Sequence, residues 1–436
     1  MMKKIFKWFK MNSRLNRRKW YQFIKVQKLF VVSVLIGFLS AFLGILLKNA
    51  TEYYENIFFH RATVNPIFFI VFPLFGLSTI YFLRRYLFKK KQNKGIKEVF
   101  ESTNSASNHL PSYKIPSHFI NGLLTVVSGG STGIEVSTVV ATATIGSVAQ
   151  RKERIFTKYK KELICAGIAA GITVLFSSPI AGILFSLEVI SRKLTKAFLF
   201  TNLISVTIAS GLSYLLNEKP LFAIEITTWH YQAIPFFILL GIIAAVHSVY
   251  LTHCVLFFKT QFSNIKQDHL KILFGSLILS LSFFVFPELY GDGYHAIKTI
   301  FSNQEEEKLS ITVILTLLGI LFLKPIVTSA TLASGGDGGV FAPSLFLGAF
   351  LGLLLALILN TYFNAGVIAI NFVILGMAAV LSASIHAPFT ALFLVCGLTN
   401  DYSLFFPILM VSLIAKYTAK FIFPFTVYTY SPSLEK

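Results

Sequence analysis

The sequence predicts an all-α polytopic membrane protein made of two repeats with many broken helices. Its 436 residues are 55% hydrophobic and 13% charged, with a mean hydropathy of +0.69, and this composition excludes an ordinary soluble domain. Long apolar segments that suit a bilayer crossing alternate with shorter apolar segments that Gly and Pro interrupt. Because interrupted segments are tolerated in hydrocarbon only where protein or a water-lined cavity satisfies the backbone, they indicate a transport pathway.

The long apolar segments are expected to be the membrane spans. In chain order they cover residues 29–47, 66–83, 198–216, 233–258, 272–286, 311–323 and 405–423. The shorter, interrupted segments cover residues 119–127, 136–149, 164–176, 180–190, 345–359 and 372–381. We expect protein to cover these shorter segments rather than lipid.

The formal charge of +20 comes largely from basic clusters beside the apolar segments, at residues 3–19, 84–91, 151–161 and 192–196. The positive-inside rule places these clusters and the N-terminus in the cytoplasm. We therefore expect a multi-pass protein of the cell (inner or plasma) membrane, with membrane lipid as a partner and no nucleic-acid binding. Residues 1–27 form a basic cytoplasmic segment whose alternating basic and aromatic residues suit an anionic leaflet.

A polar linker at residues 217–232 divides the membrane region into a first repeat, residues 28–216, and a second repeat, residues 233–430, before a tail at residues 431–436. Each half contains a Gly-containing polar turn, at residues 93–98 and 291–294, and a second glycine turn further on, at residues 129–133 and 338–343. Interrupted segments at corresponding positions of two halves indicate a binding site between inverted repeats.

The turn at residues 129–139, GGSTGIEVSTV, leads directly into an apolar helix. Glycines let backbone N–H groups approach a ligand closely, and a helix N-terminus has unpaired donors and a positive dipole end. At membrane depth this combination favours an anion. The second such turn, GGVFAP, places Pro343 in the first helical turn, where its missing N–H costs nothing.

Four segments resemble the CLC family of chloride channels and proton/chloride exchangers, in its prokaryotic type without C-terminal cytoplasmic domains. Residues 129–139 resemble the family's GxEGP turn, and residues 167–188 (GIAAGITVLFSSPIAGILFSLE) resemble its GxFxxPxxGxLFxxE segment. Residues 334–352 are similar to its GxFxP segment, and residues 376–407 to the stretch before its last helix. The resemblance implies an inverted-repeat fold with many tilted and broken helices, and a homodimer in which each subunit has its own anion pathway between the two repeats.

The resemblance also implies which residues hold the anion. Backbone donors of Gly339, Val340 and Phe341 and the phenol of Tyr428 are expected to contact it, with Tyr430 as the alternative phenol. In the first repeat the corresponding turn is Lys94, Gly95 and Ile96, with Lys94 at the position of the family's central serine. Lys94 either extends a cytoplasmic basic cluster or draws the anion to the inner mouth.

Two positions that handle protons in the family are expected to be neutral here. Aligning Gly130 and Gly133 with the family's two glycines places Thr132 at the gating glutamate, and Val189 falls at the internal glutamate of the proton-coupled exchangers. This alignment predicts passive chloride conduction without proton coupling. The alternative is a proton/chloride antiporter that uses Glu135 as a displaced gate, and a second alternative is a non-transporting membrane scaffold.

The gate position comprises Thr132, Gly133 and Glu135, and a structural interpretation competes with the functional one. Thr132 and Glu135 fit a capping box, in which the hydroxyl accepts from the Glu135 amide and the carboxylate caps back. No paired acids, metal cluster or nucleophile–base pair occurs at a plausible spacing. We therefore expect neither an enzyme nor a cofactor or metal site, with chloride and similar small anions as the transported ligands.

Overall fold

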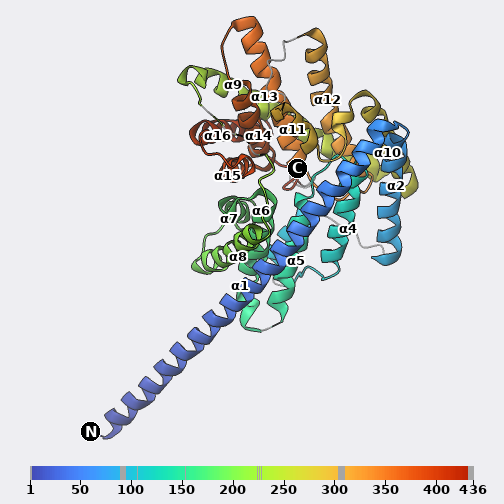
Figure 1. The fold of residues 1–436 in the computed structure, drawn as a ribbon. Helices are drawn as coiled ribbons and strands as arrows, with labels where there is room; N and C mark the ends of the chain where they lie inside the picture. The colour runs from blue at the N-terminus through green and yellow to red at the C-terminus, as the bar shows by residue number, and fades with distance from the viewer. Residues whose placement is uncertain are drawn as a thin grey trace.

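The computed structural model describes residues 2–88, 95–105, 107–152, 154–222, 224, 226, 228–302 and 310–430. Within these residues the chain forms sixteen α-helices and one isolated β-bridge (Figure 1), which confirms the all-α prediction. In chain order the α-helices are α1 (Met2–Val64), α2 (Phe68–Phe82), α3 (Ile96–Asn104), α4 (Lys114–Val127), α5 (Glu135–Arg151), α6 (Lys160–Phe176), α7 (Pro179–Phe185), α8 (Lys196–Leu215), α9 (Ile234–Asn264), α10 (Asp268–Val285), α11 (Tyr294–Ser302), α12 (Ile311–Ala333), α13 (Phe341–Phe363), α14 (Ala369–Ile385), α15 (Pro388–Thr399) and α16 (Phe405–Ile422).

Eight helices of the described chain are long and apolar enough to cross a membrane. Seven of them, α1, α2, α8, α9, α10, α12 and α16, coincide with the predicted long segments. The prediction that residues 345–359 form one of the short segments was wrong, because α13 begins at Phe341 and continues for 23 residues. Since 83% of its most apolar window is buried, α13 lies inside the protein and not against lipid.

The two halves of the chain break their helices at equivalent places. In the first half α6 ends at Ser177, which has a left-handed φ of 51°, and α7 begins at Pro179. In the second half α14 ends at His386, with a φ of 56°, and α15 begins at Pro388. A left-handed residue ends a helix, and proline is well suited to the first position of the next. These local signals produce the short helices that interrupt each repeat.

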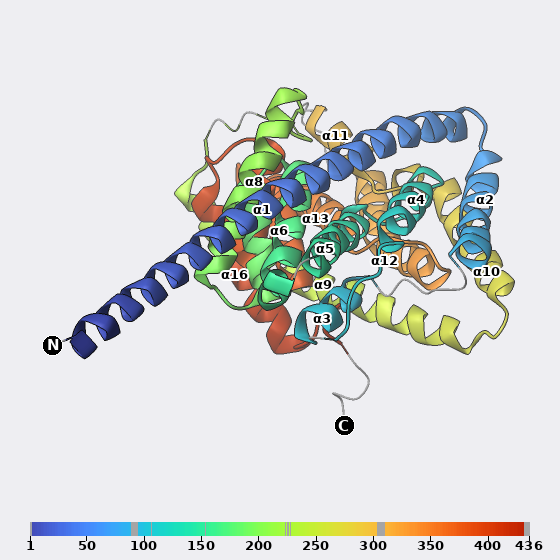
Figure 2. The same ribbon diagram turned by 90° about the horizontal axis from the view of Figure 1, so that it is seen from below.

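Two sides of the molecule are distinguished in Figure 2. The C-terminal half of α1 and the short helix α11 lie on one side, and α3 lies on the other. Helix α2 follows the end of α1 and leads to the π-helical turn η1 (Leu83–Leu87), so it connects the two sides. Helices α5 and α13 lie between them.

Close helix crossings at glycine hold the interior of the second repeat together. At Gly348 of α13, an added Cβ would overlap the carbonyl oxygen of Gly376 in α14. At Gly352 it would overlap the carbonyl oxygen of Phe372. Backbone atoms cannot move aside as a flexible side chain does, so these two helices approach this closely only because glycine lacks a side chain.

Replacing Gly348 with alanine should therefore destabilise the fold by about 3 kcal/mol, at the upper end of typical overpacking costs. The change is measured as a lower unfolding temperature of the purified protein in detergent. Gly211 of α8 is the matched control, since an added Cβ there meets no atom within 4 Å. An equal effect of both substitutions on the unfolding temperature would contradict the close-packing argument.

Candidate functional site

The loops before α5 and α13 have the same internal hydrogen bonds. In each loop a glycine N–H donates to the carbonyl of a threonine five residues earlier, Gly130 to Thr125 at 2.7 Å and Gly336 to Thr331 at 2.9 Å. The hydroxyl of each threonine also accepts a backbone N–H from the opposite loop, Thr331 from Ser131 at 3.1 Å and Thr125 from Asp337 at 2.9 Å. The two loops are therefore related by approximate two-fold symmetry.

The loops meet in an antiparallel bridge between Gly133 and Gly339. Because these glycines correspond, the residues two positions later, Glu135 and Phe341, are the equivalent first residues of α5 and α13. The alignment that placed Thr132 at the acid of the GxEGP turn was therefore wrong. Gly133 and Glu135 supply the G and E of that pattern, with Val136 and Ser137 in place of its second glycine and its proline.

The capping box predicted for Thr132 and Glu135 does not form. The residue before α5 is Ile134, and its side chain makes no capping hydrogen bond. The buried Thr132 Oγ1 has no hydrogen-bond partner in the described chain. Physically, a box would need the helix to start directly after Thr132, whereas Gly133 instead pairs with Gly339.

Glu135 is 1% exposed, and its carboxylate lies at the start of two helices. Its Oε1 accepts a hydrogen bond from Tyr294 Oη at 2.7 Å. The backbone N–H groups of Glu135 and of Ala342, in the first turn of α13, lie close to the carboxylate, while Oε2 has no hydrogen-bond partner. Since helix N-termini favour negative charge, this carboxylate occupies a place suited to an anion.

Gly133 allows the carboxylate to take this position. A Cβ built on Gly133 would overlap Glu135 Oε2, so the side chain of Glu135 folds back over the glycine two residues before it. A larger residue at position 133 would exclude this rotamer. The glycine therefore has a role in positioning the carboxylate as well as in forming the bridge.

Several predicted anion-binding residues meet at the end of a cavity on the α3 side. Tyr428 Oη accepts a hydrogen bond from Val340 N at 3.4 Å, and a Cβ on Gly339 would lie 2.9 Å from the same oxygen. Gly95, which caps α3 with a left-handed φ of 61°, and Ile96 line the same cavity. Phe341 does not line it, and its ring packs against Phe185 with centroids 5.5 Å apart.

The remaining predicted positions lie elsewhere. Lys94 is outside the described residues. Val189 is buried in the π-helical turn η3 (Ser186–Ser191). Its neighbour Glu188 accepts hydrogen bonds from the N–H and the hydroxyl of Thr390, at 2.7 and 2.6 Å, and so caps the start of α15. Tyr430 does not line the cavity; its ring packs near Phe423 and Phe425, and its carbonyl accepts from Lys97 Nζ at 2.7 Å.

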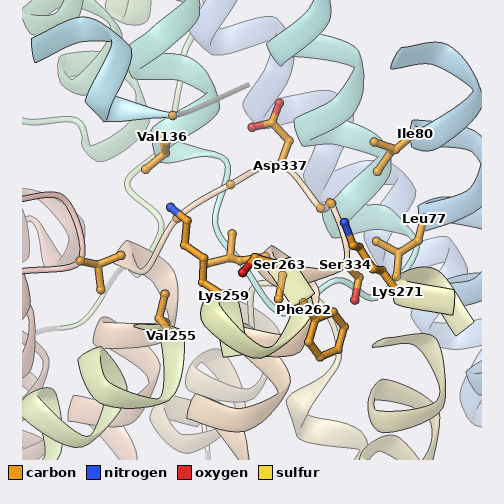
Figure 3. A pocket seen from close by; sticks show the side chains of 18 of the residues that line it. Leu77, Ile80, Val136, Val255, Lys259, Phe262, Ser263, Lys271, Ser334 and Asp337 are labelled. Carbon is orange, nitrogen blue, oxygen red and sulfur yellow. The ribbon is translucent and has the colours of Figure 1, made fainter. Parts of the chain in front are cut away.

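The cavity has a volume of about 710 Å³ and forms a basic vestibule, seen in Figure 3. Five cationic side chains line it against two carboxylates: Arg84, Arg85, Lys97, Lys259 and Lys271 against Asp268 and Asp337. Asp337 is 3.0 Å from His118 Nδ1 and 3.9 Å from Arg84, so part of the negative charge is already paired. A concave surface of one sign concentrates small ions of the other. The vestibule therefore attracts anions.

Lys97 and Lys259 lie close enough to influence each other. Partial burial, and then the charge of Lys259, lower the pKa of the Lys97 ammonium from its usual value. We expect Lys259→Met to reduce anion flux about two- to fivefold at low salt, because one attracting charge is lost. The reduction should shrink in high salt, where the Debye length is short.

The control for this prediction is Lys193→Met, because Lys193 is an exposed lysine that does not line this cavity. Flux is measured in proteoliposomes over a range of ionic strength, with both variants at equal protein density. A salt dependence of Lys259→Met identical to that of the unchanged protein would show that the vestibule charge does not steer anions. Lys259 and Tyr294 were missed from the sequence, because they lie far along the chain from the glycine turns that they approach.

Comparison with known proteins places this site in a family. The family model described as voltage gated chloride channel matches residues 75–420. The chain belongs to this CLC family of chloride channels and exchangers. The match covers both glycine turns and both helix breaks, so the CLC resemblance seen in the sequence is confirmed.

Curated CLC relatives include proteins named as channels and as exchangers. The chain is 28% identical over 300 residues to the voltage-gated ClC-type chloride channel ClcB of Salmonella dublin, covering 67% of this chain and 70% of that protein. It is 26% identical over 421 residues to the H(+)/Cl(-) exchange transporter ClcA of Citrobacter koseri, covering 90% and 85%. The crystal structure of a CLC-type fluoride/proton antiporter has the same fold, with a TM-score of 0.77 at 24% identity and coverage of 92% and 96%.

Proposed function

We propose that this chain exchanges chloride or a similar small anion for protons, with Glu135 as the gate. The supporting observation is the buried Glu135 carboxylate at the N-termini of α5 and α13. While ionised, it competes with an anion for the same helix ends. When protonated it is neutral and loses that attraction, so an anion can replace it. The proposal involves no enzymatic step and no cofactor.

This proposal replaces passive conduction as the favoured function. Passive conduction depends on neutral residues at both proton-handling positions, and the residue at one of these positions is the acid Glu135. The exchanger ClcA, which matches 90% of the chain, supports the coupled alternative. Val189 still favours passive conduction, because it offers no proton-binding group at the position of the internal glutamate.

One experiment distinguishes exchange from passive conduction. A chloride gradient is applied across proteoliposomes, and chloride and proton movement are recorded together. Proton movement against its own gradient, driven by chloride, is the expected result. Chloride efflux without proton movement would establish passive conduction. The absence of any anion efflux would favour the non-transporting scaffold.

We propose a cell-membrane location with the N-terminus in the cytoplasm. Basic residues gather at the α3 side, around Arg84, Arg85 and Lys97, and the positive-inside rule assigns such a side to the cytoplasm. The vestibule then opens inward, and the C-terminal half of α1 and α11 face outward. Cysteine labelling from either side of the membrane, at the exposed residues Tyr231 and Phe421, tests this orientation.

We also propose a homodimer through the face formed by α7, α8, α15 and α16. Ile180 and Phe389 begin the short helices α7 and α15, yet each is nearly half exposed in the single chain. Helices this short need a protein cover within a bilayer. The double substitution Ile180→Trp and Phe389→Trp should yield a monomer in detergent, measured by light scattering. A dimer that survives both changes would place the interface elsewhere.

A further inference from the structure

A second cavity of about 130 Å³ approaches Glu135 from the α1 and α11 side. Among its lining residues, Thr51 Oγ1, Glu135 Oε2 and His295 Nε2 all lack a hydrogen-bond partner within the described chain. Thr51 is 2% exposed and Glu135 1%. Buried polar atoms are normally satisfied, and a polar cavity of this size holds several waters. We call this cavity the acidic chamber, and its lining indicates that water fills it.

Glu52 also lines the acidic chamber but pairs with Lys298, and two further carboxylates are built into the chamber wall. Asp292 Oδ1 accepts from Tyr294 N at 2.8 Å, and Glu55 Oε1 accepts from Asp292 N at 3.0 Å. The same Tyr294 donates its phenol to Glu135. The three carboxylates are thus held around one turn, between α1, α5 and the start of α11, and all three line the chamber.

Lys324 is the cation that faces this group. It is fully buried in α12, and its Nζ donates to the carbonyls of Leu289 and Gly291 at 3.3 Å each. The other lysines at the chamber are already neutralised, since Lys298 bonds Glu52 at 2.5 Å and Lys48 bonds Glu218 at 3.0 Å. His295 is the remaining titratable group on the wall.

The charges of this buried group do not balance. Glu55, Asp292 and Glu135 provide three negative charges when ionised, and Lys324 provides one positive charge. Asp292 is 7% exposed and Glu55 6%, so an unbalanced charge here is costly. Bound protons restore the balance. The acidic chamber therefore favours bound protons and repels anions. The basic vestibule, on the opposite side of α5, attracts anions and disfavours bound protons.

We infer that the acidic chamber is a separate proton route to the gate, in which Asp292 and Glu55 relay protons between Glu135 and the solution on the α1 side. This inference rests on the proposed exchange function. In the relay step the O–H bond of the Glu135 acid breaks and an O–H bond forms on Asp292 through chamber water. Glu135 becomes a carboxylate and Asp292 a neutral acid. Lys324 stabilises whichever of Asp292 and Glu55 carries the negative charge.

The test measures chloride and proton flux together for Asp292→Asn and Glu55→Gln in proteoliposomes. Each substitution should lower the proton-to-chloride ratio about tenfold or more, while chloride flux changes less than about twofold. Chloride flux should also lose its dependence on pH at the α1 side only. Glu288→Gln is the matched control, because Glu288 lies in the turn η5 (Pro287–Leu289) just before Asp292 but does not line the chamber.

Three results would overturn the inference. An unchanged proton-to-chloride ratio in both variants would show that protons bypass the chamber, and increased chloride flux at an unchanged proton flux would show that the chamber carries the anion. Failure of Asp292→Glu to restore the ratio would assign Asp292 a structural role. If Asp292→Asn fails to fold, the proton-to-chloride ratio of Glu55→Gln still tests the inference. The relay and the exchange function can fail separately. If Glu135→Gln loses proton–chloride coupling while Asp292→Asn and Glu55→Gln keep it, the relay is rejected and the exchange function stands.

Discussion

Glu135→Gln should abolish proton movement and leave chloride efflux running without its dependence on pH. Glutamine has the shape of the protonated acid, and its amide oxygen can still accept from Tyr294 Oη, 2.7 Å away in the present structure. It cannot release or bind a proton in the working range. It also carries no charge to compete with an anion at the N-termini of α5 and α13. Proton flux should therefore fall to the leak of protein-free liposomes.

Chloride and proton flux are recorded in parallel between pH 4.5 and pH 7.5. This range of about three units covers the raised pKa values that burial gives to carboxyl groups. Glu188→Gln is the matched control, because Glu188 caps α15 through Thr390 and lies away from both cavities. The control should keep both coupling and pH dependence. If proton movement persists in Glu135→Gln, Glu135 is not the gate.

Local signals in the sequence predict most of this fold. Long apolar runs identify seven of the eight long helices, and Pro179 and Pro388 mark the starts of the short ones. The error at α13 has a physical cause. Its first turn contains Pro343, which resembles an interruption of the apolar run, yet proline at a helix start does not break the helix.

The site was less predictable because it depends on contacts between the repeats. Residues 128–133 contain three glycines, so spacing alone permits two alignments with the family pattern. Only the bridge from Gly133 to Gly339 selects the one that places Glu135 at the start of the helix. Likewise, no local pattern links Glu55 or Lys324 to Glu135, since α1 and α12 bring them together from distant parts of the chain.

Gly133→Ala should open the gate by displacing the Glu135 carboxylate. The backbone of Gly133 is not in the left-handed region, so alanine meets no conformational barrier there. Its methyl group would overlap Glu135 Oε2, which belongs to the movable end of a side chain. An overlap of this kind costs about 1–3 kcal/mol, equivalent to a change of about 5- to 150-fold in an equilibrium. We expect chloride flux to rise and the proton-to-chloride ratio to fall.

A double-mutant cycle separates this effect from general damage to the loop. In a Glu135→Ala background no carboxylate remains to be displaced, so adding Gly133→Ala should change chloride flux less than about twofold. The two sites are in contact, and a coupling energy of about 1–3 kcal/mol is the measured signature of displacement. Equal effects of Gly133→Ala in both backgrounds would mean that the methyl group disturbs the bridge to Gly339 instead. In that case Gly133 would maintain the pairing of the two repeats without positioning the gate.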